Sequence, residues 1–145
     1  MSLLQPTKTK YRKARKGRIR GKASKCTSLV YGEWGIKVLQ PARISARQIE
    51  ACRLAITRAL GRDGKFWMRI FPHRPVTKKP LETRMGGGKG EVAGYEARVK
   101  PGTIIFELAG ITESSAYEIF NSVSSKLPCK VKIVSSEDYF WNRLT

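Results

Sequence analysis

Seven residues from Arg84 to Gly90 carry the most suggestive chemistry in the chain. They read RMGGGKG, so glycines, whose backbone can turn sharply, stand beside a lysine and an arginine. Glycine-rich loops with a lysine hold the phosphates of nucleotides in many enzymes. The P-loop form needs Ser or Thr after the lysine to bind Mg²⁺, whereas Gly90 follows Lys89 here. The dinucleotide form G-x-G-x-x-G is replaced by G-x-G-x-G from Gly86 onward, and no helix pattern follows. The loop therefore does not predict a nucleotide-binding enzyme.

Other catalytic and metal-binding arrangements are equally hard to build from this sequence. Its three cysteines, Cys26, Cys52 and Cys129, lack metal-ligand spacing and are typical of free thiols in a reducing compartment. His73 is the only histidine, and no pair of carboxylates is placed to act as acid and base. We expect no enzyme activity, catalytic residue, metal, cofactor or small-molecule substrate. No apolar run approaches the roughly 20 residues of a membrane span, so no membrane partner is expected.

The charge of the chain indicates a polyanionic partner. Its 145 residues include 29 Lys and Arg but only 11 Asp and Glu, which gives a net charge of +18. Residues 101–145 hold four basic and five acidic residues, so residues 1–100 carry a net charge of +19. A field of this size attracts nucleic acid, although it says nothing about the fold. We expect residues 1–100 to meet the polyanion and the remainder to be an ordinary packed end.

The N-terminal segment 1–27 is predicted to be a basic, RNA-binding arm. Residues 1–25 contain ten basic residues and no acidic one, with too few apolar side chains for a core. Self-repulsion predicts that the free arm is disordered and that it becomes ordered along a nucleic-acid backbone. A solubilising tail is the alternative, but Tyr11 and Ile19 among the charges favour RNA binding. The expected RNA contacts are Lys8, Lys10, Arg12, Lys13, Arg15, Lys16, Arg18, Arg20 and Lys22.

Residues 28–134 are predicted to form a single α+β domain. Apolar periodicity predicts two amphipathic helices, one capped by Ser45 in a Ser-x-x-Gln capping box and one capped by Thr112. We expect these helices to pack on one mixed or antiparallel sheet. A long loop is expected at 72–90 and a C-terminal extension at 135–145. The expected strands lie in 28–41, 65–71, 91–109, as a pair joined by a tight turn, and 129–134.

The first helix has an arginine face opposite its apolar face. The opposite face carries Arg47, Arg58 and Arg62, and the planar guanidinium suits phosphate. A phosphate-binding face and a merely solvated face fit this pattern equally well. Two further RNA contacts, Lys78 and Lys79, are expected in the long loop. The apolar face is formed by Ile49, Cys52, Ile56, Ala59 and Leu60.

Taken in order, these motifs resemble the bacterial-type large-subunit ribosomal protein L-sixteen family. The matching stretches are LQPTKTKYRKARKGRIRG, the run from ISARQIEACRLAITRALGRDG to RMGGGKG, VKPGTIIFELAGI and KLPCKVKIV. They span roughly residues 4–134, and the series ARQIEA, RIFP, KP and RMGxGKG is specific at this spacing. Family-like sequence begins at Leu4, so we expect no transit peptide before it. Gly87 departs from the pattern, because relatives often carry lysine there.

The resemblance implies an α/β-hammerhead-like fold and a structural role in the large ribosomal subunit. The implied partners are large-subunit rRNA, neighbouring ribosomal proteins and A-site tRNA, with P-site tRNA as a further contact. The loop would point toward the peptidyl-transferase region, and some relatives hydroxylate the arginine that corresponds to Arg84. The implied location is a ribosome in the bacterial cytoplasm or in a mitochondrial or plastid matrix. The alternative is a free-standing basic nucleic-acid-binding or RNA-chaperone module. The loop residues implied to lie near rRNA and tRNA are Arg84, Met85, Gly86, Gly88, Lys89 and Gly90.

Overall fold

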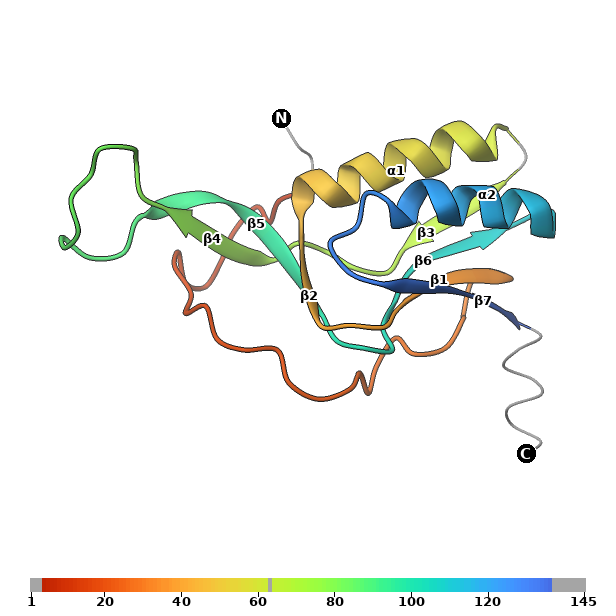
Figure 1. The fold of residues 1–145 in the computed structure, drawn as a ribbon, viewed down its shortest axis with the longest axis horizontal. Helices are drawn as coiled ribbons and strands as arrows, with labels where there is room; N and C mark the ends of the chain where they lie inside the picture. Colours follow the sequence, from red (N-terminus) through yellow and green to blue (C-terminus); the bar gives the residue numbers. More distant parts are fainter. Residues whose placement is uncertain (1–3, 63, 137–145) are drawn as a thin grey trace.

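The computed structural model describes residues 4–62 and 64–136 as two helices and two antiparallel sheets. The helices are α1 (Ala46–Leu60) and α2 (Glu113–Ser124). Figure 1 shows them side by side over one face of the larger sheet. This arrangement confirms the α+β class expected from the sequence. In the described part of the chain, neither helix has the length and apolar composition needed to cross a membrane.

The core of the domain lies between the larger sheet and the helix pair. The sheet has four strands in the order β3-β6-β1-β7, each antiparallel to its neighbours. Ile36 of β1 and Phe106 of β6 pack with Ile49 and Ile56 of α1, and all four are fully buried. The strand bounds are β1 Trp34–Val38, β3 Lys65–Met68, β6 Ile104–Ala109 and β7 Val131–Ser135.

Both helices begin at the caps that the sequence predicted. The Ser45 hydroxyl accepts a hydrogen bond from the Gln48 N–H at 3.3 Å, and the Gln48 side chain accepts one from the Ser45 N–H at 2.9 Å. This reciprocal pair is the capping box. Thr112 caps α2 in the extended conformation. The apolar face of α1 is buried as expected, except that Ala59 is exposed.

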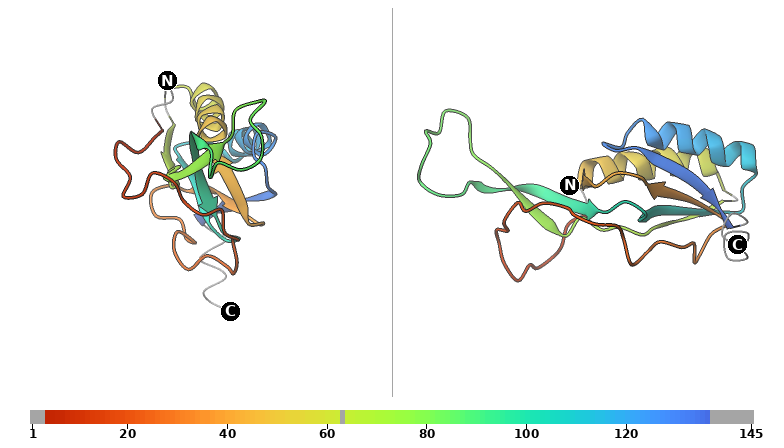
Figure 2. Two further views of the ribbon diagram at one scale, coloured as in Figure 1. Left: turned by 90° about the vertical axis from the view of Figure 1, so that its left-hand side faces the viewer. Right: turned by 60° about the horizontal axis from the view of Figure 1, so that its bottom comes forward.

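A smaller sheet extends the domain to one side and carries the long loop. Its strand order is β2-β5-β4, and its residues Ile44, Ala97 and Val99 join the same core. Past the end of β2, the paired strands β4 and β5 continue as a two-stranded stem that projects from the body (Figures 1 and 2). We call the loop at its end, residues 79–90, the finger. The strand bounds are β2 Ala42–Ser45, β4 Arg74–Lys78 and β5 Glu91–Val99.

The long loop is shorter than the sequence predicted, and β2 was not expected. Part of the expected loop 72–90 is β4, which Pro75 concealed because proline is excluded from central strands. β4 lies at the edge of its sheet, where proline is tolerated. β2 runs directly into the helix cap, so the helical pattern masked it. The strands 91–99 and 104–109 flank a turn as expected, but they belong to different sheets and do not pair.

A buried carboxylate fastens the segment before β1 across the outer face of the larger sheet. Glu107 of β6 is 0 % exposed and lies on the face away from the helices, because its neighbours Phe106 and Leu108 pack in the core. One of its oxygens accepts hydrogen bonds from the backbone N–H groups of residues 30–32 at 2.7–3.1 Å. The other oxygen accepts one from the Arg69 guanidinium. Burial alone would raise the pKa of Glu107, but these hydrogen bonds outweigh it and hold the pKa below its ordinary value.

Candidate nucleic-acid interface

From residue 4 onward the N-terminal arm forms no helix or strand, and after its start beside α1 it runs along the side of the domain away from the helices (Figures 1 and 2). Its backbone is held by the rest of the protein at several points, among them Ala23 and Gly17. The Ala23 N–H donates to the Pro101 carbonyl at 2.9 Å, and the Arg43 guanidinium donates to the Gly17 carbonyl at 2.6 Å. Of the predicted RNA contacts in the arm, Lys13 is half-buried and the others are exposed. The arm therefore presents most of its cations to solvent.

The arm and the stem of the finger are tied together where β5 begins. The Lys13 ammonium donates to the Lys89 carbonyl at 2.9 Å, and the Lys89 ammonium donates to the Ala14 carbonyl. Glu91 binds Lys13 at 3.2 Å and Arg12 at 2.8 Å. The hydrogen bond from Lys13 and the charges of both cations hold the pKa of Glu91 below its ordinary value. These contacts join two cationic segments, far apart in sequence, into one continuous surface.

The finger is open to solvent, and its conformation depends on glycine. Arg84 is exposed, and Met85 is 95 % exposed. Residues 86–88 have φ values of 102°, 67° and 85°, which residues with a Cβ rarely adopt. A Cβ at any of these positions would meet nothing within 4 Å, so glycine is needed for the turn and not for space. The finger thus leaves its tip uncovered by the described residues.

The base of the finger places its two predicted lysines at the surface. Lys78 and Lys79 are exposed, and the Lys79 ammonium donates to the Gly86 carbonyl across the loop at 2.7 Å. Gly90 closes the loop on the other side. Here the reason for glycine is space, because a Cβ would lie 2.7 Å from the Lys78 carbonyl oxygen. Both sides of the stem can therefore approach closely.

The arginines at the C-terminal end of α1 lie apart from the arm and the finger. Arg47, Arg58 and Arg62 are exposed as expected. The arm begins beside the N-terminal end of α1, where Leu4 packs against the core, and then runs along the other side of the domain (Figures 1 and 2). The structure therefore does not join Arg58 and Arg62 to the arm. Their neighbour Arg53 is paired with Glu50 at 2.7 Å. The hydrogen bond from Arg53 holds the pKa of Glu50 below its ordinary value.

Three arginines that the sequence analysis did not single out lie beneath the arm on the smaller sheet. The strand register places Arg43 opposite Arg98 and Arg74 opposite Glu96. Arg43 and Arg98 both donate to the Gly17 carbonyl. The alternation of these residues with apolar ones in ARIS and YEARV was the available signal. It could be used only once β2 and β4 were known to flank β5.

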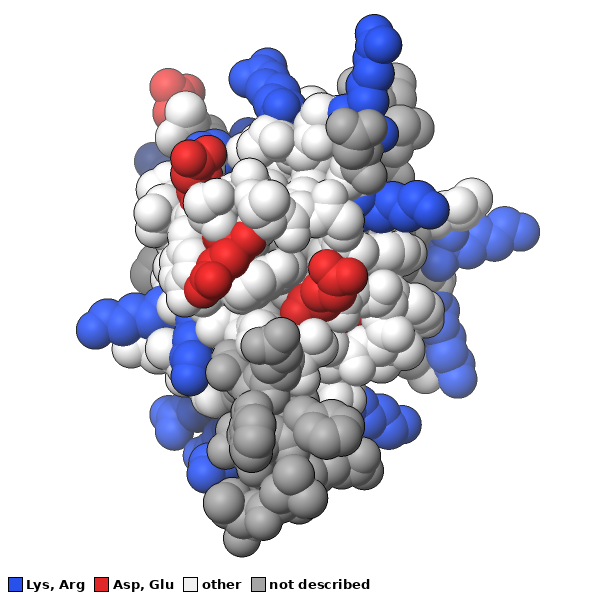
Figure 3. All heavy atoms as spheres, turned by 90° about the vertical axis from the view of Figure 1, so that its right-hand side faces the viewer, with Lys and Arg blue, Asp and Glu red and all other residues white. Residues whose placement is uncertain are grey.

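The opposite end of the molecule is less basic. Figure 3 looks at the end away from the finger, where acidic side chains gather over a largely uncharged surface and basic ones stand around the rim. This view agrees with the division of charge along the sequence, since residues 101–145 have more acidic than basic residues. The cationic surface is therefore directional, with the arm and the finger on one side.

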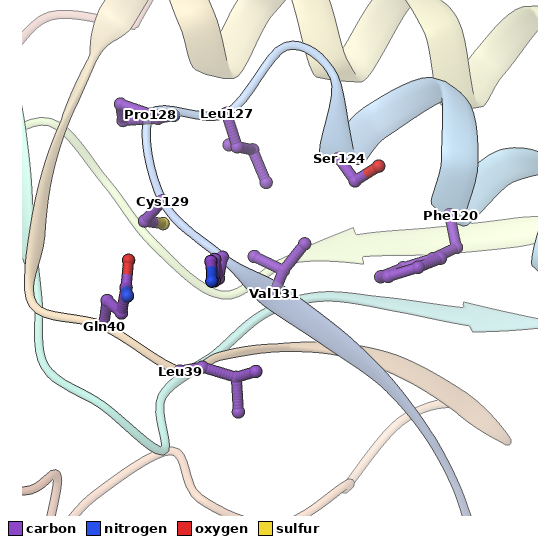
Figure 4. A pocket seen from close by; sticks show the side chains of 9 residues that line it. Leu39, Gln40, Phe120, Ser124, Leu127, Pro128, Cys129 and Val131 are labelled. Atoms are coloured by element: carbon purple, nitrogen blue, oxygen red, sulfur yellow. The ribbon is translucent and has the colours of Figure 1, made fainter.

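A separate hollow of about 570 Å³ lies between the end of α2, the chain after β1 and the start of β7 (Figure 4). Burial raises the pKa of the Cys129 thiol that lines it and raises that of Cys52 to about 11, so both thiols are protonated at neutral pH. The lining brings no histidine or carboxylate to Cys129, so this thiol is not activated as a nucleophile. Within the described residues, no cluster of histidine, cysteine and carboxylate side chains could hold a metal ion. The lining residues are Leu39, Gln40, Phe120, Ser124, Leu127, Pro128, Cys129, Lys130 and Val131.

Known proteins resemble this chain along nearly its whole length. The family model described as ribosomal protein L16p/L10e matches residues 6–134. The large ribosomal subunit protein uL16 of Sulfurihydrogenibium sp. (strain YO3AOP1) is 54 % identical over 136 residues, which cover 94 % of this chain and 99 % of the relative. The protein of the same name from Pseudothermotoga lettingae is 53 % identical over 133 residues, which cover 92 % of this chain and 94 % of the relative. The matched region includes nearly all of the arm, the finger and both sheets.

Proposed function

Because this chain belongs to the ribosomal protein L16p/L10e family and is a structural constituent of the large ribosomal subunit, we propose that its arm binds rRNA and its finger reaches tRNA. Its family is structural, so the protein is not an enzyme. Its partners are rRNA and other ribosomal proteins, which favours the ribosomal role over a free-standing RNA-chaperone module. The compartment that goes with this function is the bacterial cytoplasm or an organelle matrix.

The joint between the arm and the finger is the observation that carries the proposal. Glu91 and Lys89 at the start of β5 bind Arg12, Lys13 and the Ala14 carbonyl of the arm. The joint fixes where the finger begins relative to the arm. A polyanion bound along the arm would therefore orient the finger. Phosphate contacts of this kind position a protein on RNA without reading its sequence.

The arm is suited to rRNA because its backbone is already anchored while its cations are exposed. Each phosphate that a lysine or arginine neutralises releases counterions, so binding should weaken steeply as salt rises. RNA grooves and bends also admit a chain segment that is free of helix and strand. We expect the exposed cations of the arm to supply most of the assembly energy.

The finger is suited to a functional contact near the peptidyl-transferase region, with A-site tRNA and also P-site tRNA within its reach. Arg84 is an exposed cation two residues before the glycine turn, whereas Lys89, directly after the turn, binds the arm. Residues 86–88 are glycines with positive φ values, and because they carry no side chains an RNA backbone can approach their backbone closely. Because the arm supplies the contacts for assembly, the contacts of the finger are available to position tRNA.

Sedimentation tests the rRNA part of the proposal. The protein should migrate with large ribosomal subunits through a moderate-salt wash. Recovery in the free-protein fraction alone would contradict the proposal. Substitutions of the exposed arm cations should weaken this association in proportion to the charge removed. The reason is that the electrostatic part of the binding free energy depends on how many phosphates the protein neutralises.

Finger variants test the tRNA part. Arg84→Ala and Gly86→Val should leave incorporation into large subunits intact while lowering A-site tRNA affinity and the rate of peptide synthesis. Lys132→Ala is the control for charge, because Lys132 is an exposed cation on β7 outside the predicted RNA contacts. Gly94→Ala is the control for replacing a glycine. A Cβ at this position would meet nothing within 4 Å, and the φ of Gly94 is not positive. Normal tRNA binding and rate in both finger variants would show that the finger is only a solvated loop.

A further inference from the structure

The outer face of the smaller sheet concentrates positive charge beneath the arm. The register places Arg43 directly opposite Arg98 across β2 and β5, and Arg74 opposite Glu96 across β4 and β5. Like charges directly opposite each other in a sheet are destabilising. Glu96 is one carboxylate among three arginines, so the face has an excess of positive charge. This excess needs a counter-charge that the sheet does not supply.

The ion pairs on this face are loose although the groups are largely buried. Glu96 lies 3.8 Å from Arg43 and 3.9 Å from Arg74, which is beyond hydrogen-bond distance. The side chains of Arg74, Glu96 and Arg43 are only 11 %, 13 % and 27 % exposed. Charges at such positions are screened by salt much less than surface charges. Their guanidinium N–H groups can therefore still bind another acceptor.

The arm closes over this face with carbonyl groups and further cations. Arg43 donates to the carbonyls of Lys16 at 3.2 Å and Gly17 at 2.6 Å, and Arg98 donates to that of Gly17 at 3.3 Å. No acidic residue occurs in the arm. Among the described residues, Arg98 Nε is a buried donor without a hydrogen-bond partner. The arm therefore shields the arginines from water without neutralising them.

A cavity of about 280 Å³ lies between the arm and β4 at this point. Its charged lining consists of Lys16, Arg43, Arg74 and Lys89 against Glu96, which is four cations against one carboxylate. The rest of the lining is Ala14 and residues 75–77, so no aromatic ring is present to stack a nucleobase. The chemistry that fits is a compact oxyanion that accepts hydrogen bonds from several directions.

We propose that this cavity, which we call the arginine cradle, holds one backbone phosphate of the large-subunit rRNA. This inference rests on the proposed function, because rRNA is the source of the phosphate. Arg43 and Arg74 bind the phosphate oxygens from the sheet, and Lys16 and Lys89 bind them from the arm and the stem. Glu96 lies within 4 Å of both arginines and offsets part of their charge. The phosphate supplies the counter-charge and locks the arm to the sheet.

The first test measures oxyanion binding by the full-length protein in the absence of RNA. The midpoint of thermal unfolding is recorded in sodium sulfate and in sodium chloride at equal ionic strength. Sulfate stabilises proteins in general, so the quantity of interest is the difference between variants. Arg74→Gln should lose part of the sulfate-specific shift. Lys132→Gln, which changes an exposed lysine of β7 outside the predicted RNA contacts, should keep all of it.

A second variant keeps the test decisive if Arg74→Gln does not fold. Lys16 is an exposed residue of the arm, so Lys16→Gln leaves the core untouched. It should lower the sulfate-specific shift as well. If both folded variants respond to sulfate as fully as the wild-type protein does, the cradle is not an oxyanion site.

The second test uses an rRNA fragment and separates the cradle from the proposed function. Removing one phosphate contact should reduce the slope of log K against log salt by about 0.7–0.9. We expect this reduction for Arg74→Gln and no change for Lys132→Gln, which alters an exposed cation of β7 outside the predicted RNA contacts. An unchanged slope for Arg74→Gln, with normal migration on large subunits, would overturn the cradle and leave the function intact. A specific sulfate response without any rRNA binding would identify a site for a free oxyanion and would overturn the assignment to rRNA.

Discussion

Replacing Glu107 by glutamine should lower the free energy of unfolding by about 4 kcal/mol, a large part of the roughly 5–15 kcal/mol of a typical domain. The substitution keeps the shape of the side chain and removes its charge. The carboxylate is fully buried and accepts the N–H groups of residues 30–32 and the Arg69 guanidinium. A glutamine can turn its carbonyl toward the three N–H groups, but its amide then meets Arg69 as donor against donor.

The magnitude follows from two losses that share one cause. Hydrogen bonds to a charged group contribute about 1.5–3 kcal/mol and neutral ones about 0.5–1.5 kcal/mol, so each bond to residues 30–32 loses about 1 kcal/mol. Breaking a buried ion pair costs about 3–5 kcal/mol. The lower end applies here, because Arg69 is 13 % exposed and still donates to the Ser28 carbonyl at 3.1 Å. Both losses remove the same charge, so they do not add and the total stays near 4 kcal/mol.

Urea unfolding followed by tryptophan fluorescence measures this loss, and Glu91→Gln is the matched control. Glu91 also pairs with two cations, Arg12 and Lys13, but its side chain is 66 % exposed. An exposed pair contributes under about 1 kcal/mol, so the control should be nearly as stable as the wild-type protein. Equal losses in the two variants would refute the claim that Glu107 fastens the segment before β1.

The pH dependence provides an independent check of the same reasoning. The pKa of Glu107 is lowered in the folded protein. Its stabilisation is therefore present above the unfolded-state pKa and is lost as the pH falls through the folded-state pKa. The gap in stability between the wild-type protein and Glu107→Gln should be full at neutral pH and should shrink below about pH 4. A gap that does not change with pH would show that the charge is not the stabilising feature.

Three further outcomes are expected. Deleting residues 1–15, which removes five cations, should flatten the salt dependence of binding to rRNA fragments, and an unchanged slope would mean that this part of the arm makes few phosphate contacts. Ser45→Ala should cost about 1 kcal/mol in urea unfolding, because it removes the side-chain half of the capping box of α1, and a variant of unchanged stability would argue against that cap. A thiol reagent at mildly alkaline pH should modify exposed Cys26 quickly and Cys52 only on unfolding, because burial raises the pKa of Cys52 to about 11; equal rates would contradict its burial.

Several features of the fold could be predicted because their signals are local. The Ser45 capping box and the Thr112 cap lie within one turn of the helices that they start, so periodicity and cap chemistry located both helices. The exposure of the arm cations followed from their density and the lack of apolar neighbours. β2 and β4 were missed, since each is five residues or shorter and is hidden by an adjacent stronger signal, the helix cap or Pro75.

The sequence by itself determined the α+β class, the two helices, the separation of charge between the two parts of the chain and the resemblance to a ribosomal family. Only the tertiary structure decided which of these charges act together. The joint between arm and finger depends on contacts between residues 75 to 79 positions apart. The cradle depends on a strand register that sets Arg43 beside Arg98, and the Glu107 clasp on a segment folded back across the sheet. Such placements arise from burial and strand pairing across the whole domain, and a local pattern of residues cannot specify them.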